Sequence, residues 1–402
     1  MKKNIGILFS ASRKMGVFQY GLSIVEGLIN FCPDFNYTIF YFGEGSPKEF
    51  LKVKSFENVN FVSLDAGLNN RLGKLKVLIN ALLQEPFFVI NKKNKDILKT
   101  SKVDLLIIPL PLLFGFENKV PYIVSIPDIM HRYYPGFPEY KLWDRIKRDI
   151  VYSCSAKKSI LSVVDSKQGI YDLHKFYNIP EQKIKAIPYI PPGYIYEYKN
   201  MDNTTRDRLI SKYNLPEKFI FYPAQFWFHK NHLRLVKALR IIKEEKHSDI
   251  PLVLAGNPGA NNENYKKVMD LVKEAKMENQ VMPLGYVSDE EMVALYKKSL
   301  ALVFPTLIGP TSIPPLEAIV LGVPVLCSNL FAMPEEVGDA GVLFDPFSEK
   351  DMAEKIYKVW TSENLRKNLT ENAKKMAEKI TSERFTNEWK SAINEALYGK
   401  RS

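Results

Sequence analysis

The sequence predicts an α/β protein with two tandem domains. Short apolar runs of strand length alternate with segments of helical periodicity, and each half of the chain opens with a strand, a loop and a helix. A stretch rich in proline and polar residues separates the two halves and is typical of a linker. The length of 402 residues favours two or three domains, and the 46% hydrophobic content allows sizeable cores.

In the first half, the opening strand is followed by a small basic loop that ends at Gly16. Ser166 is an expected N-cap of a later helix. Gly43 and Gly45 follow the second strand, but Lys48 stands where a dinucleotide-binding fingerprint needs its third glycine, so the sequence does not support an NAD site. Strands are expected at residues 5–9, 37–42, 104–109, 122–126, 159–165 and 185–188, and helices at residues 17–29, 71–84 and 141–158.

Two of these helices are basic. The segment at residues 71–84 places four leucines on one face, with Lys74 and Lys76 off that face. Such a helix can lie on an anionic membrane, but we favour core packing with a solvated basic face. The helix at residues 141–158 carries several lysine and arginine residues and forms either a solvated face or a docking surface for an anionic acceptor.

The second half repeats the order of elements after a linker at residues 188–207. We place the domain boundary at residues 195/196. Ser288 and Glu291 have the spacing of a capping box at a helix start. Strands are expected at residues 219–223, 251–255, 281–283, 300–304, 323–327 and 342–344. Helices are expected to begin at about Asn231, Asp289 and Pro315. A further helix should end at Lys276, and the last helices should cover residues 349–397.

One apolar stretch, residues 299–334, contains a single charged residue, Glu317. A carboxylate in such surroundings is costly unless it is paired or used. Six prolines exclude a membrane helix, so we interpret the stretch as a strand, a loop at residues 309–314, a helix and a second strand. A loop that opens onto a helix N-terminus after a parallel strand is a common anion-binding arrangement.

The segment LVFPTLIGPTSIPPLEAIVLGVPVLCSN resembles the signature of the retaining glycosyltransferases of family 4, which have the GT-B fold. The family pattern has two glutamates eight positions apart; Glu317 matches the second, and Gly309 stands in place of the first. The segments AQFWFHKNH, LAGNPG and LGYVSDEEM match further family elements in order, and residues 334–341 resemble PE(I/V)xG(D/E)AG. The resemblance is strong over about residues 219–343 and weak in the first half.

This resemblance implies a fold and a reaction. Two Rossmann-like domains would face each other across a cleft: residues 1–195 would bind the acceptor and residues 196–383 the nucleotide-sugar. A C-terminal helix at about residues 384–402 would cross back to the first domain. The enzyme would move a hexosyl group, with retention of anomeric configuration, from a UDP- or GDP-type sugar donor to a glycan or lipid-linked acceptor.

The resemblance also implies which residues bind the donor. Lys230 matches the lysine of a basic pair, and Gln225 stands where the arginine is usual. Lys230, the loop amides of Thr311, Ser312 and Ile313 and the N-terminus of the helix that follows would stabilise the departing diphosphate. Glu317 would accept the ribose hydroxyls. With Gly309 unable to contact the sugar, Thr311 or Ser312 could do so. The expected donor-binding residues are Gly16, Gln225, Lys230, Gly256, Tyr286, Val287, Gly309, Pro310, Thr311, Ser312, Ile313 and Glu317.

In the first domain, the resemblance implies that Asp128, His131 and Arg132 belong to the acceptor or sugar site. They follow a predicted strand, in a loop, and His131 is the second expected catalytic residue because it could support an ion-like transition state. A lone histidine in a loop is more often an ordinary surface residue. The expected catalytic residues are thus Lys230 and His131.

The sequence also bears on other classes of enzyme and on metal binding. An Asp-x-Asp segment and a GxSxG segment are both absent, which argues against metal-dependent GT-A enzymes and nucleophile-elbow hydrolases. His229 and His232 have no clustered ligands, so we expect no metal and no other cofactor. The alternatives left open are a nucleotide-sugar epimerase or phosphorylase of the same fold, and a non-catalytic nucleotide-sugar-binding protein.

Charge and cysteine content suggest a setting for this reaction. The net charge of +11 favours an anionic partner, for which we expect the donor and an anionic membrane surface rather than nucleic acid. Three cysteines in apolar segments indicate buried thiols in a reducing compartment. We expect a cytoplasmic enzyme of bacterial surface-polysaccharide assembly, with at most peripheral contact with the inner face of the membrane.

Overall fold

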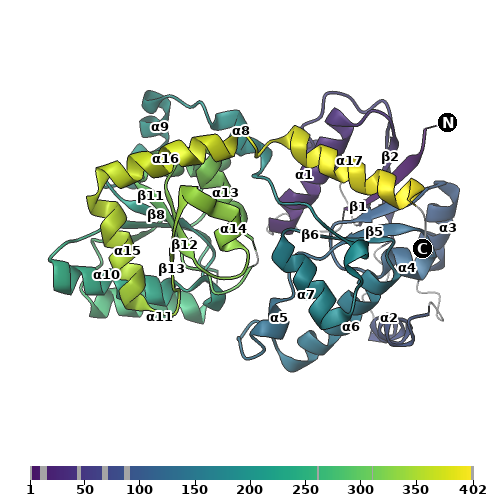
Figure 1. The fold of residues 1–402 in the computed structure, drawn as a ribbon, viewed down its shortest axis with the longest axis horizontal. Helices are drawn as coiled ribbons and strands as arrows, with labels where there is room; N and C mark the ends of the chain where they lie inside the picture. The colour runs from purple at the N-terminus through teal and green to yellow at the C-terminus, as the bar shows by residue number, and fades with distance from the viewer. Residues whose placement is uncertain are drawn as a thin grey trace. The chain divides into compact units, whose positions relative to one another are not determined.

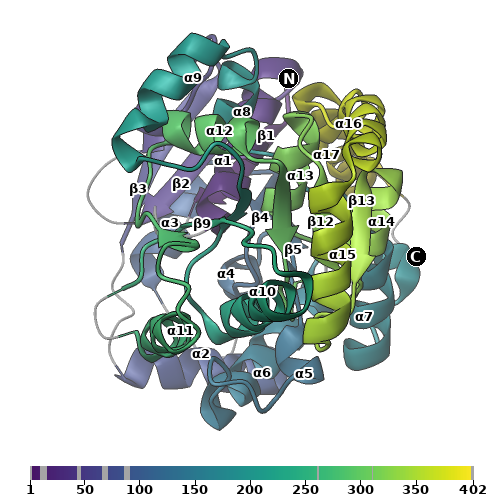
Figure 2. The ribbon, with the colours of Figure 1, turned by 90° about the vertical axis from the view of Figure 1, so that its left-hand side faces the viewer.

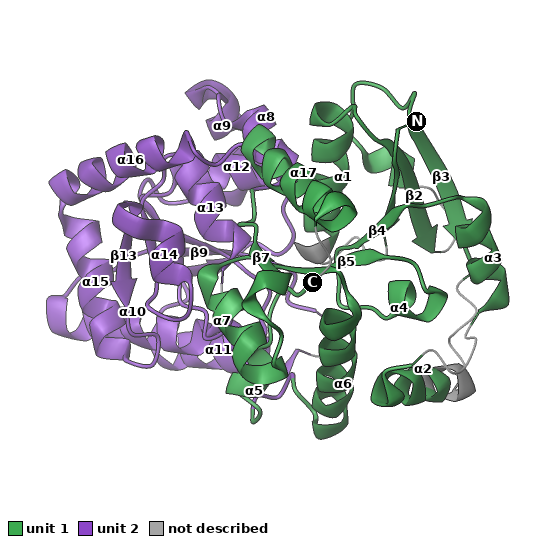
Figure 3. Ribbon diagram, turned by 45° about the vertical axis from the view of Figure 1, so that its right-hand side comes forward, with its two compact units in different colours: residues 1–136, 140–190, 382–402 green, residues 137–139, 191–381 purple. Residues whose placement is uncertain are grey.

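The computed structural model describes residues 2–9, 16–42, 47–65, 71–85, 91–259, 262–309 and 311–399. The chain forms two compact units, coloured separately in Figure 3. Unit 1 comprises residues 1–136, 140–190 and 382–402, and unit 2 comprises residues 137–139 and 191–381. The chain therefore leaves unit 1 after Ile190 and returns at Ser382, beside the boundaries that the sequence suggested.

Unit 1 is built around a seven-stranded parallel sheet in the order β3-β2-β1-β4-β5-β6-β7. Its strands are β1 (Asn4–Phe9), β2 (Asn36–Phe42), β3 (Val59–Leu64), β4 (Leu105–Ile108), β5 (Tyr122–Ser125), β6 (Leu161–Val164) and β7 (Ile184–Ala186). The order reverses between β1 and β4, as in Rossmann folds. β4 is buried along its whole length, because helices cover both faces of a parallel sheet.

The helices of unit 1 form two separate apolar layers with the sheet between them. They are α1 (Gly16–Phe31), α2 (Arg71–Leu83), α3 (Lys92–Thr100), α4 (Phe114–Asn118), α5 (Met130–Tyr133), α6 (Leu142–Lys158), α7 (Lys167–Tyr177) and α17 (Ser382–Tyr398), with 3-10 turns η1 (Pro47–Phe50) and η2 (Glu181–Lys183). The Ser166 hydroxyl accepts the amide of Gly169 at 3.2 Å, which confirms the predicted N-cap of α7.

The final helix, α17, packs on α1 within unit 1, as the sequence predicts for a helix that returns to the first domain (Figure 1). Its apolar stripe of Phe385, Trp389 and Ile393 is buried in the same core layer as α1. The two helices approach closely at Gly27, where a methyl group would overlap the hydroxyl of Thr386. The absence of a side chain at Gly27 therefore sets how near α17 can lie.

Unit 2 repeats the architecture with a six-stranded parallel sheet in the order β10-β9-β8-β11-β12-β13. Its strands are β8 (Ile220–Pro223), β9 (Leu252–Ala255), β10 (Val281–Pro283), β11 (Ala301–Phe304), β12 (Val325–Ser328) and β13 (Gly341–Phe344). The strand order reverses between β8 and β11, which makes their carboxyl ends the topological switch point of this sheet. All strands that the sequence predicts in this half are present.

Helices cover both faces of this sheet, and α10 lies beside α15 (Figure 2). The helices are α8 (Gly193–Tyr198), α9 (Asn203–Ile210), α10 (His232–Lys246), α11 (Glu263–Glu274), α12 (Asp289–Lys298), α13 (Ile313–Val320), α14 (Met333–Val337), α15 (Glu349–Thr361) and α16 (Glu363–Ala377), with 3-10 turns η3 (Ser211–Tyr213), η4 (Phe228–Lys230) and η5 (Gly338–Ala340). Ser288 and Glu291 form the predicted capping box at the start of α12.

One sequence prediction about this architecture is wrong, and one strand has no prediction. The segment at residues 199–207 was expected to be an irregular linker, but it contains the start of α9, which Asp202 caps by accepting the amide of Thr205 at 2.9 Å. The edge strand β3 was not predicted, because its residues are only partly buried and lack a clear apolar alternation. The three cysteines are free and buried, as expected. In the described part of the chain, no helix combines the length and apolarity needed to cross a membrane.

Candidate active site

The loops after β8 and β11 are joined at the switch point of unit 2. The backbone amide of Leu307 donates to the carbonyl of His229 at 2.8 Å, and the side-chain amide of Asn231 donates to the carbonyl of Pro305 at 3.0 Å. Asn231 adopts a left-handed conformation with φ of 61° and is buried. The two loops therefore form one hydrogen-bonded assembly at the carboxyl edge of the sheet, where α/β proteins bind ligands.

Lys230 lies in this assembly, at the end of η4 and two residues before the start of α10. Its carbonyl accepts the hydroxyl of Tyr222 at 2.8 Å, which ties the loop to β8. Its ammonium lies 5.3 Å from the centre of the Phe304 ring, at the end of β11. The Lys230 side chain thus reaches from the loop after β8 to the end of β11, and the N-terminus of α10 lies beside it. The ammonium and the N–H groups at this helix N-terminus can together hold an anion.

His232 is a structural residue of this loop. Its ring is fully buried and stacks on Phe226, with 4.4 Å between the ring centres. Burial lowers the pKa of His232 to about 3, and the nearby positive charge of Lys230 acts in the same direction. The imidazole is therefore neutral at physiological pH. Among the described residues, no group of three or more histidine, cysteine, aspartate or glutamate side chains could hold a metal ion.

The loops after β9 and β10 meet the loop after β8. A methyl group on Gly256 would overlap the carbonyl of Ala224, and the amide of Gly256 donates to the carbonyl of Gly285 at 2.8 Å. Gln225, Gly256, Tyr286 and Val287, all predicted donor-site residues, are thus in or next to three adjoining loops. Gln225 is exposed and the Tyr286 side chain is 81% exposed, whereas Val287 is buried.

The loop between β11 and α13 carries the other predicted donor residues. Gly309 has φ of 111°, a conformation that residues with a side chain rarely adopt. Ser312 is the N-cap of α13, and its hydroxyl makes no capping bond. Its backbone amide instead donates to both carboxylate oxygens of Glu336 on α14, at 3.1 and 3.0 Å. Thr311 and Ile313 are half-buried, and Pro310 lies outside the described residues.

Glu317 is buried in the second turn of α13, with 6% of its surface exposed. Its two carboxylate oxygens accept hydroxyl groups from Tyr194 at 3.0 Å and Tyr296 at 2.7 Å. Burial raises the pKa of Glu317 to about 7, while the two tyrosine hydroxyls act to lower it. A carboxylate has about four acceptor positions, so two tyrosines leave room for the ribose hydroxyls that the sequence analysis assigns to it.

The predicted residues of unit 1 lie at the carboxyl edge of its own sheet. Gly16 is the first residue of α1; the basic loop before it lies outside the described residues. Asp128 accepts the amide of Met130 at 3.0 Å and so helps to turn the chain into α5. Arg132 is exposed, and its guanidinium donates to Asp149 at 3.2 Å.

His131 differs from its prediction, because it lies in the short helix α5 rather than in a loop and is only 1% exposed. Its Nε2 atom lies 3.0 Å from a carboxylate oxygen of Asp149, which also accepts the hydroxyl of Tyr177 at 2.9 Å. Burial lowers the pKa of His131, whereas Asp149 acts to raise it. Asp149 and Tyr177 come from α6 and α7, and a single sequence gives no signal that pairs them with His131.

Arg132, Asp149 and Tyr177 also border a cavity of about 290 Å³ in unit 1. The cavity lies among α2, α5, α6 and α7. Its lining consists of Ala81, Leu82, Gln84, Arg132, Asp149, Ile150, Ser153, Cys154, Phe176 and Tyr177. Of the predicted site residues, Arg132 alone is in this lining.

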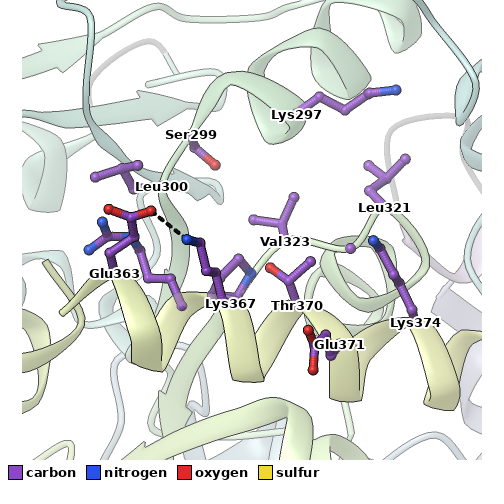
Figure 4. Close-up of a pocket in the computed structure, with 13 residues that line it drawn as sticks. Lys297, Ser299, Leu300, Leu321, Val323, Glu363, Lys367, Thr370, Glu371 and Lys374 are labelled. Atoms are coloured by element: carbon purple, nitrogen blue, oxygen red, sulfur yellow. Dashed lines mark ion pairs between the residues drawn. The ribbon is translucent and has the colours of Figure 1, made fainter.

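A larger cavity, of about 430 Å³, opens in unit 2 at the amino ends of β11 and β12, opposite the switch-point loops (Figure 4). It contains none of the predicted site residues. Three of its cations are bound within the protein: Lys297 and Arg366 donate to backbone carbonyls, and Lys367 pairs with Glu363 at 2.8 Å. The lining is Lys297, Ser299, Leu300, Leu321, Gly322, Val323, Pro324, Glu363, Arg366, Lys367, Thr370, Glu371 and Lys374.

Comparisons with known proteins find a matching family model and several relatives. Residues 203–376, which make up most of unit 2, match the model of the family described as glycosyl transferases group 1. The chain is 29% identical over 213 residues to O-antigen chain mannosyltransferase B from Escherichia coli, covering 52% of this chain and 54% of the relative. It is 30% identical over 166 residues to serotype-specific mannosyltransferase WbdA from Escherichia coli, covering 41% of this chain and 20% of the relative.

The fold also matches solved structures over nearly the whole chain. The crystal structure of Alr3699/HepE from Anabaena, in complex with UDP and glucose, gives a TM-score of 0.75 at 15% identity, covering 98% of this chain and 100% of that chain. Two parallel Rossmann-like units with a returning C-terminal helix define a GT-B protein, which confirms the predicted fold class. The match to the model of the glycosyl transferases group 1 lies within unit 2.

Proposed function

We propose that the chain transfers a hexosyl group from a nucleoside-diphosphate sugar to a glycan or lipid-linked acceptor in bacterial surface-polysaccharide assembly. The observation that carries this proposal is the position of Lys230, at the switch point of unit 2 and beside the N-terminus of α10. The chain spans about half the length of the first relative and a fifth of the second. The names of these relatives favour mannose as the sugar.

In the proposed reaction, unit 2 holds the donor and unit 1 holds the acceptor. The bond between the sugar's anomeric carbon and the diphosphate breaks, and the acceptor hydroxyl forms a new bond to that carbon and loses its proton. Lys230 and the N–H groups at the start of α10 stabilise the diphosphate as its charge grows. Tyr286 and Val287 border the base, and Glu317 accepts the ribose hydroxyls.

The test offers GDP-mannose and UDP-glucose to the protein, each with lipid-linked oligosaccharide from bacterial membranes. We expect one donor to be consumed with release of its nucleoside diphosphate, and the new linkage to keep the donor's anomeric configuration in NMR spectra. The alternatives predict other outcomes: an epimerase changes the sugar without an acceptor, a phosphorylase needs inorganic phosphate, and a binding protein consumes nothing. Because the sequence has no Asp-x-Asp segment, EDTA should leave transfer unchanged.

We further propose that unit 1 contacts the inner face of the cytoplasmic membrane through α2 and α6. These helices pack against each other. The sequence predicts core packing for α2, but Leu75 and Leu82 are more than half exposed, so that prediction is wrong for these side chains. The start of α6 adds exposed Leu142 and Trp143, the latter 72% exposed.

Basic side chains accompany this apolar surface. Residues on α6 and just before it include Lys141, Arg145, Lys147 and Arg148, and α2 contributes Lys76. Apolar side chains with a surrounding positive charge suit the interface of an anionic bilayer, where hydrophobic burial and electrostatic attraction add. Such contact would bring the enzyme to a lipid-linked acceptor while the chain remains peripheral.

A further inference from the structure

The turn that carries Lys230 is held by a carboxylate from residues 137–139, a segment that belongs to unit 2 (Figure 3). One oxygen of Glu139 accepts the backbone amide of His229 at 3.1 Å and lies 2.9 Å from its ring atom Nδ1. An ionised carboxylate can only accept, so Nδ1 carries the hydrogen of this second bond. His229 directly precedes Lys230 and is only 8% exposed. Glu139 therefore fixes both the backbone and the ring of His229.

Glu139 acts as the cap of the turn η4. In a 3-10 turn each N–H bonds to the carbonyl three residues earlier, and the amide of Lys230 does so with Trp227 at 3.0 Å. The amide of His229 comes before this bond, and the N-cap residue Trp227 makes no capping bond with its side chain. Glu139 thus takes the place of a capping side chain, although it lies 90 residues from His229 in the sequence.

A contact between two aromatic rings accompanies this cap. Phe137 meets Phe228 edge to face, with 5.2 Å between the ring centres. Aromatic pairs of this kind have a defined geometry. Residues 137–139 are therefore bound to the turn at two consecutive positions, Phe228 and His229.

The other side of the turn is fixed by the loop after β11. The carbonyl of His229 accepts the amide of Leu307 at 2.8 Å and the hydroxyl of Thr306 at 3.3 Å. His229 is thus held by Glu139 through its N–H groups and by the loop after β11 through its carbonyl. Lys230 continues the same backbone, so the origin of its side chain follows from the position of His229.

The charge of Glu139 strengthens this hold. Burial acts to raise the pKa of Glu139, but the hydrogen bonds from His229 outweigh burial and leave this pKa below its ordinary value of 4.5. The carboxyl group is therefore ionised at physiological pH. Hydrogen bonds to an ionised acceptor are about twice as strong as those between neutral groups.

We propose that Glu139 is a positioning residue of the donor site, which places the ammonium of Lys230 for the diphosphate by holding His229. The inference rests on the proposed function, because it assigns a further residue to the site that Lys230 forms. Since a misplacement of about 1 Å can cost about a hundredfold in rate, Glu139 should affect transfer without contacting the donor.

The test is a double-mutant cycle between Glu139 and Lys230. Transfer is measured as kcat/KM for GDP-mannose or UDP-glucose, whichever wild type uses, with lipid-linked oligosaccharide as the acceptor. In the wild-type background, we expect Glu139→Ala to lose about tenfold or more. In the Lys230→Ala background, we expect a further loss of less than about threefold, because no ammonium is left to be positioned. A residue that only stabilises unit 2 would cost the same in both backgrounds.

Three further variants sharpen this cycle. Glu139→Gln keeps an oxygen that can accept both N–H groups of His229, and it should transfer within about threefold of wild type. Glu354→Ala removes an exposed carboxylate from α15 of the same unit and should transfer as wild type does. If circular dichroism shows Glu139→Ala to be unfolded, Glu139→Asp replaces it with the same expected contrast between backgrounds, because its shorter side chain draws the carboxylate away from His229.

Two outcomes would overturn the inference while the proposed function stands. Wild-type rates in Glu139→Ala would show that the turn holds Lys230 without this contact. Equal losses in the two backgrounds would show that Glu139 acts independently of Lys230. If wild type transfers neither sugar, the proposed function itself fails, and this result is distinct from an active wild type with an unaffected Glu139→Ala.

Discussion

The hydroxyl of Tyr296 donates to the carboxylate of Glu317 at 2.7 Å in the interior of unit 2. The partner comes from α12, and Tyr194 of α8 donates to the other oxygen of the same carboxylate at 3.0 Å. The one charged residue in the apolar stretch at residues 299–334 is therefore fixed by two hydroxyl groups. This pairing makes an otherwise costly buried acid tolerable and holds α13 in place.

The elevated pKa of Glu317 predicts a specific dependence of stability on pH. Folding raises this pKa from 4.5 to about 7. Between these pH values, the Glu317 carboxyl group keeps its proton in the folded protein and loses it in the unfolded chain. The contribution of Glu317 to the free energy of unfolding should therefore fall as pH rises from about 4.5 to 7. The fall is about 3 kcal/mol, at about 1.4 kcal/mol for each pKa unit.

Urea unfolding of wild type and Glu317→Gln between pH 4.5 and 8 measures this contribution. The free energy of unfolding of Glu317→Gln should depend less on pH than that of wild type. Glu317→Gln should therefore gain stability relative to wild type as pH rises. Glu354→Gln, which changes an exposed carboxylate, serves as the control and should follow wild type. Parallel curves for wild type and Glu317→Gln would contradict the pKa assignment.

Gly27→Ala should destabilise unit 1. A methyl group at this position overlaps the hydroxyl of Thr386, which is buried between α1 and α17. Overpacking costs about 1–3 kcal/mol, partly offset by the better helix propensity of alanine, about 1 kcal/mol. We expect a lower melting temperature in calorimetry.

Gly136→Ala is the matched control, since no atom lies within 4 Å of the added methyl group. The double variant Gly27→Ala/Thr386→Ala should recover part of the loss, because it removes the clashing hydroxyl. A Gly27→Ala protein as stable as wild type would show that α17 can move away from α1 at no cost.

Trp143→Ala should weaken binding to anionic lipid vesicles. Trp143 is the most exposed apolar side chain among those described on the proposed membrane-contacting helices, and large aromatic rings favour the bilayer interface. Sedimentation with phosphatidylglycerol-containing vesicles measures the bound fraction, which should fall with rising salt as basic residues are screened. Tyr171→Ala, which alters an exposed aromatic residue on α7, is the control. Equal vesicle binding by wild type and Trp143→Ala would contradict this surface assignment.

The sequence predicts the two sheets well because strands of a parallel sheet are buried on both faces and appear as continuous apolar runs. β4 and β11 are examples, and each lies within or close to its predicted range. The edge strand β3 was missed because an edge strand is partly exposed and lacks that pattern. The start of α9 was missed because polar residues of a helix on the surface resemble a linker.

The candidate site was predictable only in part. Glu317 is visible in the sequence because a lone charge in an apolar stretch is a local pattern. Lys230 is indicated by the resemblance of its segment to the glycosyltransferase family. Their partners are not local: Tyr194 precedes Glu317 by 123 residues. The contact between Ser312 and Glu336 likewise depends on how α14 packs beside α13, which no local pattern reports.

Lys230→Ala should reduce transfer by about two orders of magnitude, as expected when a preorganised cation or donor at a developing negative charge is removed. Lys237→Ala is the matched control, because it removes an exposed lysine from α10, one turn beyond the loop. Steady-state kinetics with the donor that wild type uses should show the loss in Lys230→Ala alone. Equal rates in both variants would place the diphosphate elsewhere.

Nucleotide binding reports on the donor site at the switch point of unit 2. A thermal-shift series of wild type, Lys230→Ala and Lys237→Ala with UDP, GDP, ADP, CMP and NAD identifies both the site and the base. A ligand at a hundred times its dissociation constant adds about 2.7 kcal/mol of stability, enough to raise the melting temperature by several degrees. We predict stabilisation by one nucleoside diphosphate in wild type and Lys237→Ala, and its loss in Lys230→Ala. Stabilisation by none of them, or by NAD alone, would contradict a donor site at the switch point of unit 2.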